Sequence, residues 1–529
     1  MKRNEDQSFL LKKKAIRSKL MPEDILEKIK KGIKKEWKIS FFSTIIIGFL
    51  THMYIFTNRI PNHDGLINIY NTQLKFQSGR FFLGPFSGIS SYFDLPWING
   101  SLSIIYLGLV AVVLNEFFEL RKTLSLILSG GLIVTFPTIA STFSYLFTAD
   151  GYMMGFLLSV LALLMTKRYK MGFIPGSVLL YLSVGIYQAN LTLVLTIIAV
   201  WFLRELLFPQ KNLKVLFRAL SKYGFLVVLG MSYYTITFKL YQKVFSGHLT
   251  DYQGIDQIGV HSGSILGKFL QIKDAFMHFF FRGFFTDYPI KLFEVFNLIL
   301  FVVIVFAVVW LMISNKVYQS PLRMLIMMVC AVLIPIFSYC LYFVSPGVEY
   351  HMLMVMSLVS IYQLPLLLYD RFEIRTITIK WLSWGTVLTA ALIIFNFSII
   401  SNIAYFNATL KYERSAALMN RVLDRMEQTE GFEDATKIAV FGIISMNTQI
   451  SSTTVSKNIP EMTGAMGEVI LSRPYHFEYM LANQFGVALE RLSEEELDDL
   501  QKDPLVQQME PWPSKNSVKI YNGIVILKF

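Results

Sequence analysis

Apolar runs alternate with short polar connections over residues 39–402. A run of about 18 uncharged residues lets a helix cross the hydrocarbon layer, because each residue advances it by about 1.5 Å. The pattern predicts about eleven transmembrane helices. Pro137, Pro335 and Pro365 lie inside runs and are compatible with kinked spans. The runs are centred on 39–58, 101–118, 124–142, 150–166, 172–187, 190–208, 223–242, 293–313, 323–344, 352–369 and 381–402.

Basic residues fall on alternate connections between these runs. If the N-terminus is cytoplasmic, the predicted inside segments hold 28 Lys and Arg residues, whereas the five outside connections hold seven. Positive charge gathers on the cytoplasmic side of multi-pass proteins. We therefore expect a multi-pass protein of the cell (plasma) membrane with a cytoplasmic N-terminus. After eleven spans, the C-terminus lies outside the cytoplasm.

Composition agrees with this class. Hydrophobic residues make up 54% of the chain and charged residues 16%, against about a quarter in soluble domains. The net charge of +12 reflects in part a basic segment, residues 1–38, in which Ile25, Ile29, Ile33 and Trp37 recur at helical spacing. Such a helix binds anionic headgroups, so we expect the lipid bilayer, and no nucleic acid, as its partner.

Two outer loops and the C-terminal segment complete the predicted domain organisation. The loops are residues 59–100 and 246–291, and the second contains an amphipathic stretch that we place in the outer interface. Residues 39–402 form the transmembrane domain, and 403–529 a small extracytoplasmic α+β domain. In that domain a helix continues to about Gln428, and strands follow at 437–444 and 517–527. Asn522-Gly523 predicts a hairpin, and Ser493 with Glu496 a capping box.

The first outer loop carries the leading candidate for chemistry. Asn62-His63-Asp64-Gly65 precedes a helical pattern formed by Leu66, Ile69, Tyr70 and Leu74. This places Asp64 near a helix N-terminus, where the helix dipole favours an ionised carboxylate. Asp64 is then either a helix cap or a general base at the outer face of the membrane.

Further polar residues lie at other outer helix ends. Arg80, in Ser78-Gly79-Arg80, is suited either to phosphate oxygens or to a contact with a headgroup or a loop carboxylate. Asp94, in Asp94-Leu95-Pro96-Trp97, is a second candidate ligand. Asp150, in Thr148-Ala149-Asp150-Gly151, is interpreted first as a helix cap.

Tyr187, Gln188, Glu349 and His351 lie at the outer ends of later spans and are candidate binding residues. His63 is a further candidate binding residue. His63 and His351 could bind a metal, but two histidines without close spacing are weak evidence for a metal site. The two cysteines, both in one apolar run, give neither a disulfide framework nor zinc-ligand spacing. No metal ligand is therefore assigned and no cofactor is required, although a carboxylate-bound divalent cation is left open. The chain contains no P-loop or dinucleotide fingerprint.

The order of these motifs resembles the Gtr type II glucosyltransferase family, membrane enzymes of the GT-C superfamily that modify bacterial surface polysaccharides. The resemblance rests on short motifs at outer helix ends and extends in layout over about residues 35–400. The motifs are His63-Asp64-Gly65, Ser78-Gly79-Arg80, Asp94-Leu95-Pro96-Trp97-Ile98-Asn99-Gly100, Ala149-Asp150-Gly151-Tyr152 and Ile186-Tyr187-Gln188-Ala189.

The resemblance implies an inverting hexosyltransferase that takes sugar, by the family name glucose, from a polyprenyl-phosphate donor. It implies Asp64 as the base and a surface polysaccharide as acceptor: O-antigen, teichoic acid or another wall glycan. Arg80 would stabilise the departing phosphate, and Asp94 or Asp150 would orient the sugar or the acceptor. The alternatives are a flippase, polymerase or ligase of lipid-linked glycans, or a scaffolding membrane protein without activity.

Overall fold

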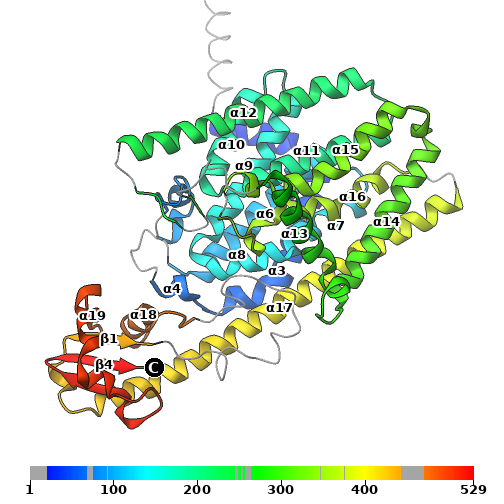
Figure 1. Ribbon diagram of the computed structural model, residues 1–529. Coiled ribbons are helices and arrows are strands. Elements are labelled where there is room, and N and C mark those ends of the chain that lie inside the picture. The colour runs from blue at the N-terminus through cyan, green and yellow to red at the C-terminus, as the bar shows by residue number, and fades with distance from the viewer. Residues whose placement is uncertain are drawn as a thin grey trace, which may run out of the picture.

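The computed structural model describes residues 21–67, 75–91, 93–244, 248–251, 254–255, 264–345, 347–373, 376–442 and 470–529. Most of these residues are helical, and the helices form one bundle from which a small α/β unit extends (Figure 1). The membrane part contains α2 (Pro22–Gly32), α3 (Lys35–Thr57), α4 (His63–Ile67), α5 (Leu83–Phe86), α6 (Pro96–Phe118), α7 (Thr123–Thr135), α8 (Pro137–Thr142), α9 (Leu146–Arg168), α10 (Phe173–Ile186), α11 (Asn190–Leu207), α12 (Leu213–Val244), α13 (Ile265–Phe285), α14 (Leu292–Ser314), α15 (Pro321–Ser338), α16 (Val359–Asp370) and α17 (Ile377–Glu427).

Within the described residues, eight helical stretches are long and apolar enough to cross a membrane. One of them, Thr123–Arg168, comprises α7, α8 and α9, and the apolar helix α10 is shorter, with 14 residues. The prediction of a mostly helical protein is therefore confirmed, and the eight candidate spans agree with a polytopic membrane protein. The count of eleven spans stays a prediction. Pro335 and Pro365 lie inside α15 and α16 as expected. Pro137 differs, because α7 ends at Thr135 and Pro137 opens α8, where a proline needs no hydrogen-bonded N–H.

The centre of the bundle is formed by α9 and α11, which are enclosed by their neighbours. Helix α9 packs against α6 and α10, and α11 packs against α15 and α16. Outer helices expose large apolar side chains instead, as Val228 of α12, Val302 of α14 and Trp381 of α17 do. Exposed apolar surface on this scale is stable when it faces lipid.

Beyond the bundle, α17 continues without a break past residue 402 and carries the C-terminal unit (Figure 1). The unit contains β1 (Lys437–Phe441), α18 (Pro474–Phe485), β2 (Glu490–Arg491), α19 (Glu494–Lys502), α20 (Pro504–Gln507), β3 (Val518–Tyr521) and β4 (Ile524–Lys528). The sheet order is β2-β1-β4-β3, with β1 parallel to β2 and β4, and β3 antiparallel to β4.

The local signals read from this segment are confirmed. Asn522 and Gly523, with φ of 51° and 72°, turn the chain between β3 and β4, as a two-residue hairpin requires. Ser493 and Glu496 form the capping box of α19. The predicted strand 437–444 begins as β1, and residues 443–444 lie outside the described residues.

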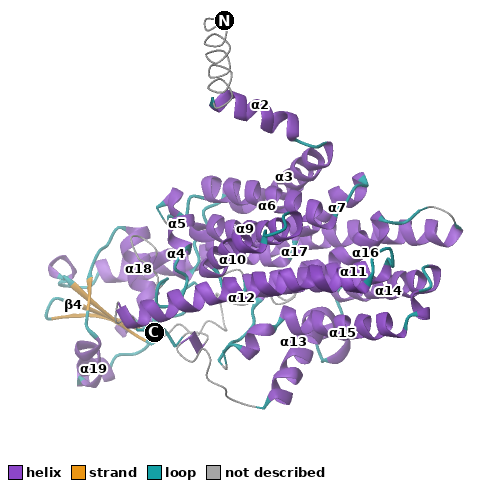
Figure 2. Ribbon diagram, turned by 90° about the horizontal axis from the view of Figure 1, so that it is seen from above, coloured by secondary structure: helices purple, strands orange, loops and turns teal. Residues whose placement is uncertain are grey.

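At the other end of the chain, α2 stands apart from the bundle (Figure 2). The predicted basic amphipathic helix is interrupted between α2 and α3, where Ile33 and Lys34 are extended. Lys34 Nζ and Trp37 Nε1 both bind the Glu116 carboxylate of α6, at 2.6 and 2.8 Å. These contacts fix the start of α3; residues 1–20 of the segment lie outside the described residues.

Candidate functional site

The short helix α4 presents Asp64 in its first turn. The N-terminus of α4 is capped by Asn62, whose Oδ1 accepts the Gly65 N–H at 2.5 Å. Because Asn62 serves as the cap, Asp64 is not needed for that role. Its side chain is 41% exposed, and its Oδ1 lies 3.7 Å from His63 Nε2. Asp64 is thus a solvent-accessible carboxylate at the positive end of a helix. Of its predicted helix partners, Leu66 lies in α4, whereas Ile69, Tyr70 and Leu74 lie outside the described residues.

Asp94 approaches the same helix from the segment that precedes α6. A Cβ added to Gly65 would lie 2.6 Å from Asp94 Oδ2, so the Asp94 carboxylate contacts the backbone next to Asp64. Its other oxygen, Oδ1, accepts the Phe147 N–H of α9 at 3.1 Å. Desolvation raises the pKa of Asp94 to about 6, although the Phe147 hydrogen bond and the charge of Arg59 oppose the shift.

Asp150 occupies a different position from the predicted helix cap. Helix α9 begins at Leu146, four residues earlier, so Asp150 lies inside the helix and is fully buried. The interpretation of Asp150 as a cap is therefore wrong. At the start of α9 it is Asp94 that accepts a hydrogen bond from a backbone N–H, that of Phe147. Asp150 Oδ1 accepts a 3.4 Å hydrogen bond from Asn99 of α6, and no described residue binds its Oδ2.

The loop that carries Arg80 is fixed to α9, α10 and α12. Arg80 Nη1 donates to the Tyr152 hydroxyl at 3.2 Å, and its guanidinium lies 5.3 Å from the centroid of the Tyr187 ring. Gln188 Nε2 donates to Ser78 O at 2.7 Å and to the Tyr234 hydroxyl at 3.0 Å. The motifs containing Arg80, Tyr187 and Gln188, which are distant in sequence, therefore meet here.

Arg80, Tyr187, Gln188 and Tyr234 line an apolar cavity of about 170 Å³. Arg80, Gln188 and His351 provide polar groups, and aliphatic and aromatic side chains form most of the wall. Burial and the charge of Arg80 lower the pKa of His351 to about 4, so its imidazole is neutral at physiological pH. Arg80 is then the one charged side chain among the described lining residues. The cavity can hold a small anionic group attached to an apolar chain.

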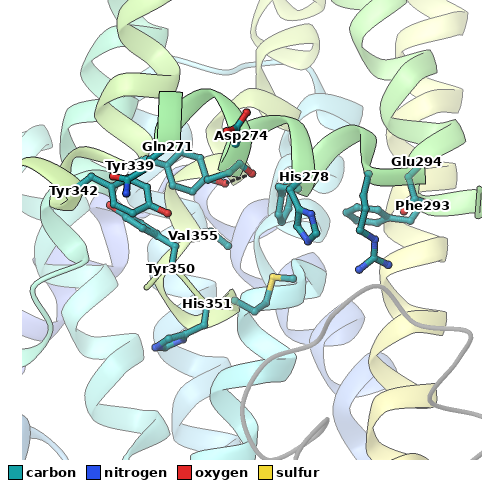
Figure 3. Close-up of a pocket in the computed structure, with 14 residues that line it drawn as sticks. Gln271, Asp274, His278, Phe293, Glu294, Tyr339, Tyr342, Tyr350, His351 and Val355 are labelled. Carbon is teal, nitrogen blue, oxygen red and sulfur yellow. Dashed lines mark hydrogen bonds between the residues drawn. The ribbon is translucent and has the colours of Figure 1, made fainter. Parts of the chain in front are cut away.

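Figure 3 shows a second cavity, of about 490 Å³, which shares the lining residue His351 with the first. Its walls come from α13, the start of α14 and the segment 339–355. Asp274, His278, Arg282 and Glu294 line it together with three tyrosines. The sequence interpretation missed this cavity because it considered only the apolar residues of α13.

The predicted site residues therefore separate into groups. Arg80, Tyr187, Gln188 and His351 share the apolar cavity, whereas Asp64, Asp94 and Asp150 are not among the residues that line either cavity. Glu349 is exposed next to the loop that carries His351. His63 lies beside the C-terminal unit, its ring centroid 5.5 Å from that of His476. Among the residues described, no three His, Cys, Asp or Glu side chains are grouped as metal ligands would be.

The sequence model of a known family, described as Glucosyl transferase GtrII, matches residues 53–364. The chain belongs to this family. The resemblance found in the motifs is thus confirmed over more than half of the 529 residues. Comparisons with curated proteins and with solved structures gave no significant match.

The GtrII match bears directly on the site. It contains α4, Arg80, both cavities and every candidate residue from His63 to His351, and it ends before α17. The match therefore supports glucosyltransferase activity for the bundle, and it does not include the C-terminal unit.

Proposed function

We propose that this GtrII protein transfers glucose from a polyprenyl-phosphate donor to a cell-surface polysaccharide at the outer face of the membrane. The observation that carries the proposal is the apolar cavity in the GtrII-matched segment, where Arg80 is the charged group. A lipid phosphate needs both an apolar wall and a cation, and the planar guanidinium of arginine suits phosphate oxygens.

In the proposed reaction, an acceptor hydroxyl attacks the anomeric carbon from the face opposite the phosphate, which inverts the configuration. Asp64 takes the hydroxyl proton as this bond forms. The bond between the anomeric carbon and the phosphate oxygen breaks, and polyprenyl phosphate leaves with the electron pair. Arg80 stabilises the charge of the departing phosphate.

Asp94 and Asp150 act in this proposal as positioning residues. Asp94 joins the start of α9 to the backbone of α4, so it fixes the helix that carries Asp64. Asp150 accepts a hydrogen bond from Asn99, which in turn donates to Ser90 at 3.0 Å. These contacts hold the loop before α6 against α9.

The proposed membrane topology has eleven crossings in a GT-C-like arrangement. Helices α7 and α8 together form one crossing, α10 forms another, and residues 352–369 form a third that ends in α16. The N-terminus is cytoplasmic, and the C-terminal unit is extracytoplasmic, as the distribution of Lys and Arg supports. Asp64, Arg80 and both cavities then lie on the outer side.

The flippase alternative requires a path for lipid through the inner half of the bundle. In the described structure, inner helix ends are joined by ion pairs: Glu205 binds Arg204, Lys211 and Arg371 at 2.6, 2.8 and 3.2 Å. This arrangement favours a site that opens on the outer side alone.

The test uses purified full-length protein in liposomes with labelled polyprenyl-phosphate glucose and surface polysaccharide from the producing cells. We expect the wild type to label the polymer and Asp64→Asn to lose about 10²- to 10⁴-fold in rate, the usual contribution of a general base. Asp287→Asn, the same change at an exposed residue after α13, should retain the wild-type rate.

Equal unfolding temperatures would show that the variants are folded. Full activity in Asp64→Asn would remove Asp64 as the base. If the wild type made no glycosidic bond with several sugars and acceptors but moved lipid between leaflets, the transferase proposal would give way to a flippase.

A further inference from the structure

Four polar residues of α13 point toward one cavity. Gln271, Asp274 and His278 follow one another at intervals of three or four residues, so they share one face, and Arg282, which follows a kink at Phe281, lines the same cavity. This face lines the 490 Å³ cavity (Figure 3). Apolar side chains elsewhere on α13, such as Leu266, are exposed as lipid-facing residues are. An interfacial helix thus directs its polar groups toward a cavity.

Opposite these residues lies a cluster of tyrosines. The ring centroid of Tyr350 lies 4.8 Å from those of both Tyr339 and Tyr342. The Tyr339 hydroxyl donates to Ala275 O at 3.3 Å, and the Tyr350 hydroxyl accepts the Leu341 N–H at 3.0 Å. These bonds fix two of the rings, and Tyr342 completes an aromatic wall. Such a wall suits the apolar C–H face of a pyranose ring.

The charges of this cavity distinguish it from its apolar neighbour. The described lining contains two carboxylates, Asp274 and Glu294, and one guanidinium, Arg282. Lys273, outside the lining, pairs with Asp274 at 3.1 Å. The balance of charge gives no net attraction for a phosphate, whereas carboxylate, amide and imidazole groups bind hydroxyls well. The volume of about 490 Å³ is within the range of about 300–1,000 Å³ that is usual for ligand sites.

We propose that this cavity binds a neutral hexose-containing segment of the acceptor glycan. The proposal rests on the transferase function above and adds where the acceptor binds. His351 lies between the two cavities, so a glycan bound by α13 and the tyrosines would lie next to a lipid phosphate held by Arg80. Gln271, Asp274 and His278 are exposed, and a polymer can therefore reach the cavity from outside.

The test measures the binding of acceptor and of lipid phosphate separately in full-length protein. Fluorescently labelled surface polysaccharide from the producing cells and undecaprenyl phosphate serve as the two probes, and Kd is measured for each in detergent. We expect the double variant Asp274→Asn/His278→Gln to bind polysaccharide about 10- to 100-fold more weakly, because two hydrogen bonds are weakened. Its affinity for undecaprenyl phosphate should stay within twofold. Arg80→Gln should show the opposite pattern.

Matched controls make the same substitutions at exposed positions. The double variant Asp287→Asn/His248→Gln should bind both probes as the wild type does. Tyr342→Leu should weaken polysaccharide binding, and Tyr342→Phe should retain it, since the aromatic face rather than the hydroxyl makes the contact. Equal loss in both Tyr342 variants would remove the stacking role.

Polysaccharide binding that is unaffected by the α13 changes, or absent in the wild type, would overturn the inference. Loss of undecaprenyl phosphate binding in the α13 variant would assign this cavity to the donor instead. Failure of the proposed function would give a different result. The wild type would then bind the glycan in a way that depends on α13, but it would transfer no sugar.

Discussion

At the scale of single residues, Asp94 joins two elements that carry the proposed chemistry. Its carboxylate accepts the Phe147 N–H and lies against the backbone at Gly65, one residue after Asp64. Desolvation raises its pKa to about 6. The ionised carboxylate, which predominates at pH 8, therefore makes the folded protein less stable than the protonated form would. Residues retained despite such a cost are frequently tied to function.

This cost gives a pH-dependent prediction for Asp94→Asn. The pKa of Asp94 is about 6 in the folded state and 3.8 in the unfolded state. Protonation of Asp94 therefore favours the folded state, and its contribution to the free energy of unfolding is complete below pH 3.8. That contribution is lost as the pH rises through about 6. The neutral amide should therefore raise the unfolding temperature at pH 8, and the difference from wild type should shrink toward pH 5. Thermal unfolding in detergent at both pH values measures the effect.

The same variant should transfer sugar about five- to tenfold more slowly at pH 8, because the hydrogen bond from Phe147 loses its charged acceptor. A stability gain of equal size at both pH values would show that Asp94 does not titrate near pH 6. An unchanged rate would show that it does not position α4.

At the scale of elements, the position of α4 depends on the C-terminal unit. Leu66 is 1% exposed and belongs to the same apolar core as Leu418 and Val422 of α17 and Val525 of β4. Asn483 Nδ2 of α18 donates to Leu66 O at 2.7 Å. The helix that carries Asp64 thus packs against residues more than 350 positions away in the chain, at the junction seen in Figure 1.

We therefore predict that Asn483→Ala lowers kcat by about two- to tenfold, the effect of one lost hydrogen bond, while KM for the donor is unchanged. Backbone amides of residues 63–67 should exchange hydrogen faster, as mass spectrometry can measure. Asn516→Ala, at an exposed position before β3, is the control. Unaltered exchange at 63–67 would refute a positioning role for α18.

At the scale of the whole molecule, ion pairs join the helix ends that the proposed topology places on the inner side. Glu205 of α11 is 1% exposed and binds three cations from α11, the following loop and the end of α16. Glu119, at the end of α6, binds Lys167 of α9 at 2.8 Å and Arg371 at 3.3 Å. Four helices are therefore connected on the side away from Asp64.

Glu205→Gln should destabilise the protein by about 3–5 kcal/mol, since removing the carboxylate leaves the buried guanidinium of Arg204 without its counter-charge. Chemical denaturation in mixed micelles, followed by tryptophan fluorescence, measures the loss. Glu27→Gln removes the exposed pair with Lys31 and should leave the transition unchanged. Similar stabilities for the two variants would show that the buried pairs do not secure the inner ends.

Short-range patterns in the sequence were sufficient to predict much of the fold. The helical runs, the break between α10 and α11 at Gln188, the hairpin turn at Asn522-Gly523 and the capping box at Ser493 each depend on neighbours a few residues apart. Hydropathy and backbone preference act over that range, so these features could be predicted without knowledge of packing. The motifs that led to the GtrII family are short and local in the same way.

Tertiary structure decided how these pieces form a site. Asp94 accepts the hydrogen bond from the Phe147 N–H at the start of α9, although it lies 53 residues away in the sequence. Asp150, predicted to cap this helix, lies inside it instead. The polar residues of α13 become a cavity wall only because residues 339–355 fold opposite them. Leu66 of α4 is buried in the apolar core that residues of the C-terminal unit form. Each contact depends on the closure of long loops and on the packing of distant helices, and no periodicity along the chain encodes which partners meet.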